Sequence, residues 1–503
     1  MVALAYTVAF DGIEARLVEV QCAVSPGVPN FALVGLPDKA VSEAKERVRA
    51  ALAAMSIALP AKRITVNLSP ADMPKEGSHF DLPIALAVLA ALEIIPKEDI
   101  AATVALGELA LDGRLIPVIG ALPSAMTAAE NDFILLCPKQ CGAEAAWVGT
   151  ATVFAASSLA EVVRHFTGQQ KLERAMAGEV VTTAPGRDLR DVKGQERAKR
   201  ALEIAAAGRH HMLLVGPPGS GKSMLAARLP GILPPLSAVE ALETSMIHSL
   251  AGLLTQGGIS RTRPFCEPHH TASMAAIVGG GKGAKPGEVS LAHNGVLFMD
   301  EFPEFPRAVL ETLRQPIETG EIVVARANAH IRYPCRFLLV AAANPCKCGF
   351  MTDPARACAK VPLCGEDYLG RISGPLMDRF DLRVEVPPVA YTDLDLPATG
   401  ETSATVAVRV AAARMIQTRR FADHQGMRVN ADAEGAVLEQ IATPDTESRE
   451  LLARVAERFG LTARGYHRVL RVARTIADLD NSADLRRPHV AEAVSYRIVA
   501  SKN

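Results

Sequence analysis

Short β-rich runs alternate with alanine-rich helical runs along residues 1–165. Alternating apolar and polar positions predict strands at Arg63–Pro70 and Phe133–Pro138, and apolar positions three to four apart predict a helix at Ser42–Ala54. This pattern indicates an α/β domain. The longest apolar run, Leu82–Ile95, has 14 residues and contains a proline. Because a membrane-spanning helix needs about 20 apolar residues, we expect a buried core helix there.

Two polar stretches divide the rest of the chain. Residues 166–190 have no periodic apolar face and lead into TTAPGRDLRD, so we interpret them as a linker. A second α/β domain is predicted over residues 191–390, beginning with a helix at Gln195–Ala207 and the strand HMLLVG. Residues 391–503 open with a segment rich in Pro, Gly and acids and then become almost wholly helical. They predict a helical C-terminal domain.

Composition narrows the class of protein. The formal charge of -1 provides no global basic field, so any nucleic acid would have to bind a local patch. The first residues lack the basic flank of a signal peptide, and we expect a cytoplasmic protein that does not enter a membrane. Nine cysteines in a reducing compartment do not indicate a disulfide framework.

One motif predicts a nucleotide site. GPPGSGKS at residues 216–223 follows an apolar strand and precedes the helical MLAARL. Its glycines let backbone N–H groups converge on phosphates, and the helix N-terminus adds its dipole. We expect Lys222 to bind the β- and γ-phosphates and Ser223 to bind Mg²⁺. The residues predicted to bind ATP are Gly216, Pro217, Pro218, Gly219, Ser220, Gly221, Lys222, Ser223 and Asp300.

Two later strands end in polar residues that suit hydrolysis. GVLFMDE is a buried strand that ends in Asp300, expected to hold Mg²⁺ through water, and Glu301, expected to polarise the attacking water. RFLLVAAANP ends in Asn344, whose neutral side chain can position water near the γ-phosphate. In GPLMDRFDL, Arg379 is a candidate for stabilising the transferred charge from a neighbouring subunit. Arg371 in GRISGP is its competitor, and either arginine can instead be a structural ion-pair residue.

With these motifs in order, the chain resembles the ComM/YifB branch of the magnesium-chelatase-like AAA+ family over nearly its whole length. The most specific stretches are FALVGLPDKAVSEAKERVRAAL, NLSPADMPKEGSHFDLPIAL, PFCEPHHTASMAAIVGGGKGAKPGEVSLAHNGVLFMDEFPEF, RISGPLMDRFDL and LTARGYHRVLRVARTIADLD. The resemblance implies a ring-shaped, hexameric ATPase. For a ComM-type member it also implies a DNA helicase that promotes branch migration during natural transformation, on forked, three-stranded or single-stranded DNA.

The resemblance also implies roles for single residues. Asn344 matches the first sensor, Arg379 the arginine finger, and Arg464 the second sensor, which reports the γ-phosphate to the helical lid. Two insertions are shared with the family, Pro268–Ala292 and the expected hairpin EIVVARANAHIRYP, and such hairpins line the pore in related ring motors. Their charges suit contacts to phosphates, although each can also be a solvated loop charge. The candidate DNA contacts are Lys282, Lys285, Arg326 and Arg332.

The N-terminal domain resembles the Lon-protease fold but departs from its active-site pattern. His79 stands at the position of the serine nucleophile, two residues after Gly77. The lysine that would serve as base is missing from GELALDGRLIPVIGALPSA, which has Leu122 and Pro123 there. A serine without a base is a poor nucleophile, so we expect a proteolytically inactive domain that binds a partner or DNA.

Four of the cysteines lie close together in the sequence. Cys346, Cys348, Cys358 and Cys364 follow Asn344 in one loop with the spacing C-x-C-x9-C-x5-C. Four thiolates suit tetrahedral Zn²⁺, and the resemblance adds a comparable cluster in many relatives. The first pair is closer in sequence than is usual for zinc, so unligated thiols are the alternative.

Three functions are compatible with the sequence. The first is a DNA translocase of the ComM type. The second is a chelatase-like or chaperone-like ATPase that remodels a protein partner. The third is an ATP-dependent peptidase, which His79 and the missing lysine disfavour.

Overall fold

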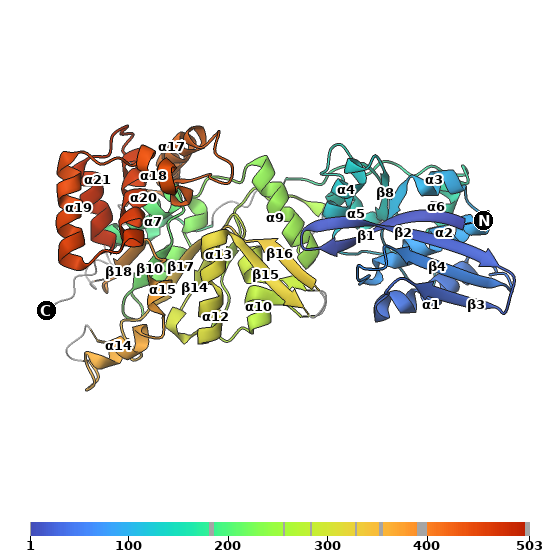
Figure 1. The fold of residues 1–503 in the computed structure, drawn as a ribbon, viewed down its shortest axis with the longest axis horizontal. Helices are drawn as coiled ribbons and strands as arrows, with labels where there is room; N and C mark the ends of the chain where they lie inside the picture. Colours follow the sequence, from blue (N-terminus) through green and yellow to red (C-terminus); the bar gives the residue numbers. More distant parts are fainter. Residues whose placement is uncertain are drawn as a thin grey trace.

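The computed structural model of the chain describes residues 2–180, 186–254, 257–281, 284–326, 329–351, 356–389 and 400–497. An α/β domain occupies one end of the molecule, a second α/β domain the middle, and a group of helices the other end (Figure 1). This is the predicted fold class. The described part of the chain contains no helix that is both long and apolar enough to cross a membrane.

The N-terminal domain is built on a seven-stranded sheet with the order β3-β4-β2-β1-β5-β8-β9. β1 pairs antiparallel with β2, and β2 with β4, while the other neighbours are parallel. The strands are β1 (Val2–Asp11), β2 (Glu14–Ser25), β3 (Asn30–Val34), β4 (Arg63–Ser69), β5 (Thr103–Ala105), β8 (Ile134–Pro138) and β9 (Thr152–Ala156), with β6 (Glu108–Leu109) and β7 (Leu115–Ile116) forming a separate small hairpin.

Helices cover both faces of this sheet. Successive strand residues point to opposite sides, and both sides carry apolar side chains that have to be buried. Val8 of β1 packs in the cluster under α4 and α5, whereas Ala9 packs in the cluster under α1 and α2. After Asp81, α2 is apolar on all sides, and it is buried as far as Ala90, as the Leu82–Ile95 run predicts, although the helix ends at Ala91. The helices are α1 (Lys39–Ala54), α2 (Asp81–Ala91), α3 (Lys97–Ala101), α4 (Ala121–Glu130), α5 (Lys139–Ala145) and α6 (Leu159–Phe166).

The central domain contains a five-stranded, all-parallel sheet with the order β11-β14-β17-β10-β18. Its strands are β10 (Met212–Val215), β11 (Phe265–Cys266), β14 (Val296–Met299), β17 (Leu338–Ala343) and β18 (Leu382–Glu385). Because the carboxyl ends of parallel strands share one edge, the loops after β10, β14 and β17 meet there. These are the three loops that carry the predicted hydrolytic residues.

Short helices and two hairpins surround the central sheet. The hairpins are β12 (Gly279–Gly280) with β13 (Lys285–Pro286), and β15 (Glu321–Arg326) with β16 (Ala329–Pro334). The helices are α7 (Glu196–Gly208), α8 (Lys222–Ala226), α9 (Ala238–Ala251), α10 (Met274–Val278), α11 (Glu288–Leu291), α12 (Arg307–Thr312), α13 (Arg314–Thr319), α14 (Leu363–Leu369) and α15 (Gly374–Met377).

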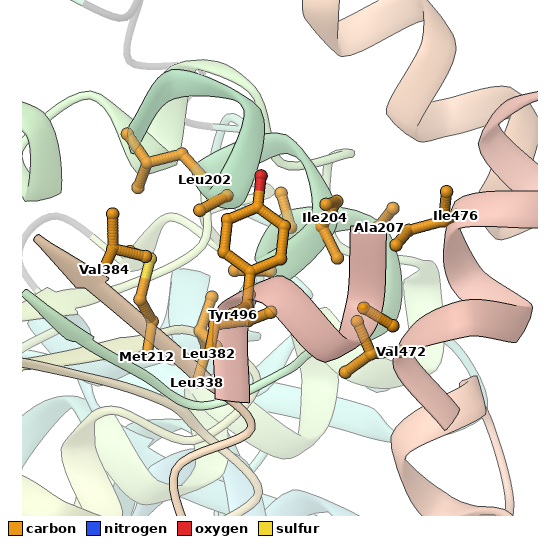
Figure 2. Packing of buried hydrophobic residues seen from close by; sticks show 14 of the residues in the cluster. Leu202, Ile204, Ala207, Met212, Leu338, Leu382, Val384, Val472, Ile476 and Tyr496 are labelled. Atoms are coloured by element: carbon orange, nitrogen blue, oxygen red, sulfur yellow. The ribbon is translucent and has the colours of Figure 1, made fainter. Parts of the chain in front are cut away.

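The C-terminal helices share a core with the central sheet. They are α17 (Ser403–Arg420), α18 (Gly435–Ile441), α19 (Thr446–Phe459), α20 (Ala463–Leu479) and α21 (Arg487–Arg497). One apolar cluster runs from the sheet through α7 to these helices. Figure 2 shows part of it, with side chains labelled from the sheet, α7, α20 and α21: Met212, Leu338, Leu382, Val384, Leu202, Ile204, Ala207, Val472, Ile476 and Tyr496. The helical region is therefore packed directly onto the second α/β domain.

Candidate nucleotide-binding site

The glycine-rich loop leaves β10 and enters α8, which begins at Lys222. Gly219 and Gly221 have φ of +77° and +91°, and a Cβ built on either meets nothing within 4 Å. Glycine is used here for its left-handed backbone and not because space is short. The Nζ atom of Lys222 donates to the carbonyl oxygens of Gly216 and Pro217 at 2.7 and 2.9 Å.

Lys222 also reaches the third strand of the site. Its Nζ donates to Oδ1 of Asn344, at the end of β17, over 3.2 Å. Burial lowers the pKa of Lys222, while the charges of Asp300 and Glu301 act to raise it. The loop, the acidic pair and Asn344 are thus brought together at one edge of the sheet. In this arrangement the ammonium group of Lys222 can bind the phosphates of a nucleotide that lies where the loops after β10, β14 and β17 meet.

The two residues predicted to bind magnesium are in direct contact. The Oγ of Ser223 donates to Oδ2 of Asp300 at 2.6 Å, and the backbone N–H of Glu301 donates to Oδ1 of Asp300 at 2.8 Å. A hydroxyl and a carboxylate oxygen form a donor set that Mg²⁺ accepts, with water and phosphate completing its coordination. The residues present therefore fit the metal, which would neutralise developing charge on the phosphates.

Glu301 has a contact that sequence reasoning missed. Its backbone is left-handed, with φ of +49°, and its carboxylate lies 3.2 Å from Nδ1 of His270. The His270 ring stacks beside His269 and meets the edge of Phe305. His270 lies in the loop between β11 and α10, at the start of the insertion that carries β12 and β13. The paired histidines of PHHTAS were the only sequence signal for it.

Arg379 and Arg464 meet at one carboxylate. Arg379 is buried, donates to the carbonyl oxygen of Pro375 at 2.6 Å and forms a short ion pair with Glu318. Arg464, which is mostly exposed, lies 3.9 Å from the same Glu318 oxygen. Glu318 and Arg464 line a cavity of about 790 Å³ between the central domain and the C-terminal helices, and no phosphate-loop residue lines it. The structure therefore groups the two arginines away from the Lys222 loop of their own chain.

Arg371 has different surroundings. Its Nη1 donates to Glu304 at 3.1 Å and to the carbonyl oxygen of Pro303 at 3.4 Å, and its guanidinium lies over the ring of Tyr368. Glu304 and Pro303 belong to the turn directly after Glu301. Arg371 therefore sits beside the acidic strand of its own chain.

The four clustered thiols form two close pairs. The sulfur atoms of Cys346 and Cys348 are 3.1 Å apart, and those of Cys358 and Cys364 are 3.2 Å apart. Hydrogen bonds from the backbone of Phe350 and from Cys346 lower the pKa of Cys348 to about 7. A hydrogen bond with Cys358, together with burial, raises the pKa of Cys364 to about 12.

This arrangement does not support the expected zinc site. A tetrahedral Zn²⁺ with 2.3 Å bonds holds its sulfur atoms about 3.8 Å apart, farther than either pair. Over the described ranges, no group of three or more His, Cys, Asp or Glu side chains is arranged to hold a metal ion. The loop does touch the nucleotide site, because a Cβ built on Gly349 would lie 2.5 Å from Cδ of Pro218. The thiols pair with one another beside the phosphate loop.

The candidate DNA contacts are only partly described. Lys282 and the side chain of Arg326 lie outside the described part of the structure. Lys285 and Arg332 are exposed, on β13 and β16 respectively. The hydroxyl of Tyr333 donates to the carbonyl oxygen of Ala284 at 2.9 Å, which joins the two hairpins that carry these charges.

The N-terminal domain buries three charged or polar residues of PADMPKEGSHFDLPIAL, the segment that corresponds to the Lon nucleophile segment. His79 is enclosed, hydrogen-bonded at 2.9 Å to the carbonyl oxygen of Val8, and burial lowers its pKa to about 4. Asp81 is fully buried and paired with Arg47 at 2.6 Å. Lys75 is also buried and donates to the carbonyl oxygen of Pro70. A substrate could reach none of these three groups, which counts against the peptidase interpretation.

Family models of magnesium chelatase match three segments of the chain. "Magnesium chelatase, subunit ChlI" matches residues 188–394, "Subunit ChlI of Mg-chelatase" residues 18–140, and "Magnesium chelatase, subunit ChlI C-terminal" residues 400–497. The first segment contains the whole nucleotide site, and the third contains Arg464. The family to which these models belong implies ATPase activity.

Full-length relatives are more specific. The chain is 44% identical to Competence protein ComM of Haemophilus influenzae over 98% of this chain and 97% of that one. It is also 44% identical to YifB of Escherichia coli over 99% of this chain and 97% of its relative. The magnesium-chelatase 38 kDa subunit of Rhodobacter capsulatus is 30% identical over 39% of this chain and 54% of its own. From this similarity along its whole length, the chain belongs to the ComM/YifB family of AAA+ proteins with magnesium-chelatase-like domains.

Proposed function

We propose that this protein is an ATP-driven, ring-forming DNA motor of the cytoplasm, which unwinds or branch-migrates recombining strands during natural transformation. The observation that supports DNA as the substrate is the full-length similarity to Competence protein ComM. Hydrolysis is assigned to Glu301 as base, with Asn344 positioning water, Lys222 on the phosphates, and Ser223 and Asp300 at Mg²⁺.

The arginine geometry supports assembly into a ring. Arg379 and Arg464 share Glu318 and lie away from the Lys222 loop. In this proposal they act on the nucleotide of a neighbouring subunit, and Glu318 holds them until that phosphate arrives. A heterologous contact of this kind closes into a ring, for which we propose six subunits. Arg371 is assigned a role within its own chain, because it bonds the turn after Glu301.

The joined hairpins support a DNA substrate. Lys285 and Arg332 are exposed on two hairpins that Tyr333 links through Ala284. With a formal charge of -1 for the whole chain, attraction to phosphates has to be local, and these hairpins are where we place it. Lys282 and Arg326 complete the proposed set of contacts.

Strand displacement on forked and three-stranded DNA with ATP tests the proposal. We expect ATP-dependent displacement, ATPase stimulation by DNA, and binding that weakens steeply with salt. The Lys285→Ala, Arg332→Ala double variant should keep basal ATPase and lose the stimulation, whereas a Lys62→Ala, Arg63→Ala control, at two exposed positions of the N-terminal domain, should keep both. An active ATPase that neither binds nor remodels any of these DNA substrates would overturn the DNA assignment.

A protein-remodelling ATPase is the second candidate. The observation that favours it is the similarity of part of the chain to the magnesium-chelatase 38 kDa subunit. ATPase assays with forked DNA, with an unfolded protein and with neither separate the two candidates. Stimulation by the unfolded protein alone would favour remodelling.

Zinc remains a prediction from the cysteine spacing, and the geometry of the thiols does not support it. It rests on four thiols in two contacting pairs, which the metal would have to spread apart. Metal analysis of freshly purified, reduced protein decides it. About one zinc per chain is the supporting result, and none removes zinc from the proposal.

A further inference from the structure

The turn between β1 and β2 extends from the N-terminal domain and lies beside the β15–β16 hairpin (Figure 1). Gly12 in this turn has φ of +67°. A Cβ built on it would lie 2.3 Å from the carbonyl oxygen of Arg332 and 3.5 Å from Cγ2 of Ile331. No real Cβ tolerates the first distance, so the glycine permits direct contact between the two backbones.

Apolar side chains extend this contact. Phe10 and Ile13, on either side of Gly12, pack against the cluster that contains Ile331 and Tyr333 of β16. That cluster is the core on one face of the central sheet, so the tip of the N-terminal β1–β2 hairpin packs against the ATPase domain. Burying such side chains stabilises the contact, more for fully buried residues than for half-buried ones.

The N-terminal domain makes a second contact with the central domain, through different residues. The indole N–H of Trp147 donates to the carbonyl oxygen of Gly257 at 2.9 Å, and its ring packs against an apolar cluster that includes Leu236 and Ile259. The buried carboxyl group of Glu144 accepts a hydrogen bond from Ser249 of α9. Helix α9 itself packs against β13, the strand that begins at Lys285.

Both contacts therefore lead to the hairpins. The first touches β16, and the second touches the helix that supports β13. The hairpins are joined by the Tyr333–Ala284 hydrogen bond and by close packing at Gly279, where a built Cβ would lie 3.2 Å from Cγ2 of Val324. The N-terminal domain, α9 and the two hairpins form one continuous packed unit.

We infer that the N-terminal domain is a mechanical brace, which holds the β12–β13 and β15–β16 hairpins in the position that couples DNA to ATP turnover. This assigns the domain a function that needs none of the residues of the Lon active-site pattern. The DNA half of the inference rests on the proposed function, whereas the bracing contact does not. Gly12 is its most sensitive position, because any side chain there pushes against the backbone of Arg332.

Gly12→Val and Gly168→Val in the full-length protein test the brace. Gly168 has φ of +74°, and a Cβ built on it meets nothing within 4 Å, so the control carries the same left-handed backbone cost without a neighbour. We expect Gly12→Val to keep basal ATPase and to lose stimulation by a forked DNA duplex. Gly168→Val should keep both. Full stimulation in Gly12→Val would overturn the coupling.

A second variant, Ile13→Ala, avoids a folding defect caused by a strained backbone. Hydrogen exchange measures the contact without DNA. Ile13→Ala removes an apolar contact without altering the backbone, and Leu111→Ala, in an exposed turn, is its control. The backbone amides of Ile331, Arg332 and Tyr333 should exchange faster in Gly12→Val and Ile13→Ala than in wild type and both controls. Unchanged exchange would overturn the brace. If wild-type ATPase is not stimulated by DNA, the proposed function fails, and the exchange result alone decides whether the brace exists.

Discussion

The polar residues that match a catalytic pattern differ in exposure between the two α/β domains of this chain. In the N-terminal domain Lys75, His79 and Asp81 are buried and satisfied by backbone carbonyls or by an ion pair. In the ATPase domain Ser223 and Glu301 are exposed at the edge of the sheet, and their contacts are polar groups that a metal or a nucleotide can replace.

The difference shows that a polar residue at a matching sequence position is not enough for chemistry. Buried groups that are already hydrogen-bonded stabilise a fold and cannot exchange their partners cheaply. A reactive group needs an accessible position and a partner that can leave. By this criterion Lys75, His79 and Asp81 are structural, whereas Ser223 and Glu301 are open to a ligand. Lys222 and Arg379 are buried too, so the proposed reaction requires each of them to exchange a carbonyl or carboxylate partner for phosphate.

The largest expected effect is on ATP hydrolysis and comes from removing Arg379, the proposed arginine finger. Arg379→Ala should bind ATP almost normally and lose about 10³–10⁵ in hydrolysis rate, because in the proposed ring its target phosphate belongs to another subunit. Steady-state ATPase together with a nucleotide-binding assay measures this separation. Mixing Arg379→Ala with Lys222→Ala protein should restore some activity at mixed interfaces. If Arg379→Ala stays active while Arg371→Ala is dead, the finger has been assigned to the wrong arginine.

The next effect separates binding from hydrolysis inside one site. Lys222→Ala should not bind ATP, whereas Glu301→Gln should bind it and lose about 10²–10⁴ in turnover, because only the proton-accepting group is removed. Glu304→Gln, three residues further along the same segment, is the matched control and should hydrolyse ATP. Single-turnover hydrolysis after ATP loading distinguishes these variants. Normal turnover in Glu301→Gln would show that another group is the base.

The smallest expected effect is on the stability of the N-terminal domain and comes from the buried residue His79. Burial lowers the pKa of His79 from 6.5 to about 4, so the folded state favours neutral imidazole. Above pH 6.5 His79 is neutral in both the folded and the unfolded chain. As the pH falls from 6.5 to about 4, only the unfolded chain takes up the proton, so the free energy of unfolding decreases by about 3 kcal/mol. Denaturant unfolding followed by the fluorescence of Trp147 measures it. His79→Gln should flatten this pH dependence, and the exposed His467→Gln should not.

The sequence by itself determined the fold class and which loops meet at the candidate nucleotide site. GPPGSGKS, the acids that end in Glu301, and Asn344 each follow a buried apolar strand, and parallel strands present their carboxyl ends at one edge. Local pattern and sheet geometry were therefore sufficient to bring Lys222 beside Asn344. The apolar run Leu82–Ile95 likewise predicted the buried helix α2 (Asp81–Ala91), because an apolar surface on all sides of a helix has to be enclosed.

Only the tertiary structure decided which side chains meet across elements distant in sequence. Arg379 and Arg464 share Glu318, His270 meets Glu301, and Gly12 touches Arg332. Periodicity specifies which face of an element is buried, but not which loop from another part of the chain lies against it. That choice follows from how the sheet, the C-terminal helices and the N-terminal domain pack together as solid bodies, with glycine allowing the closest approach of their backbones.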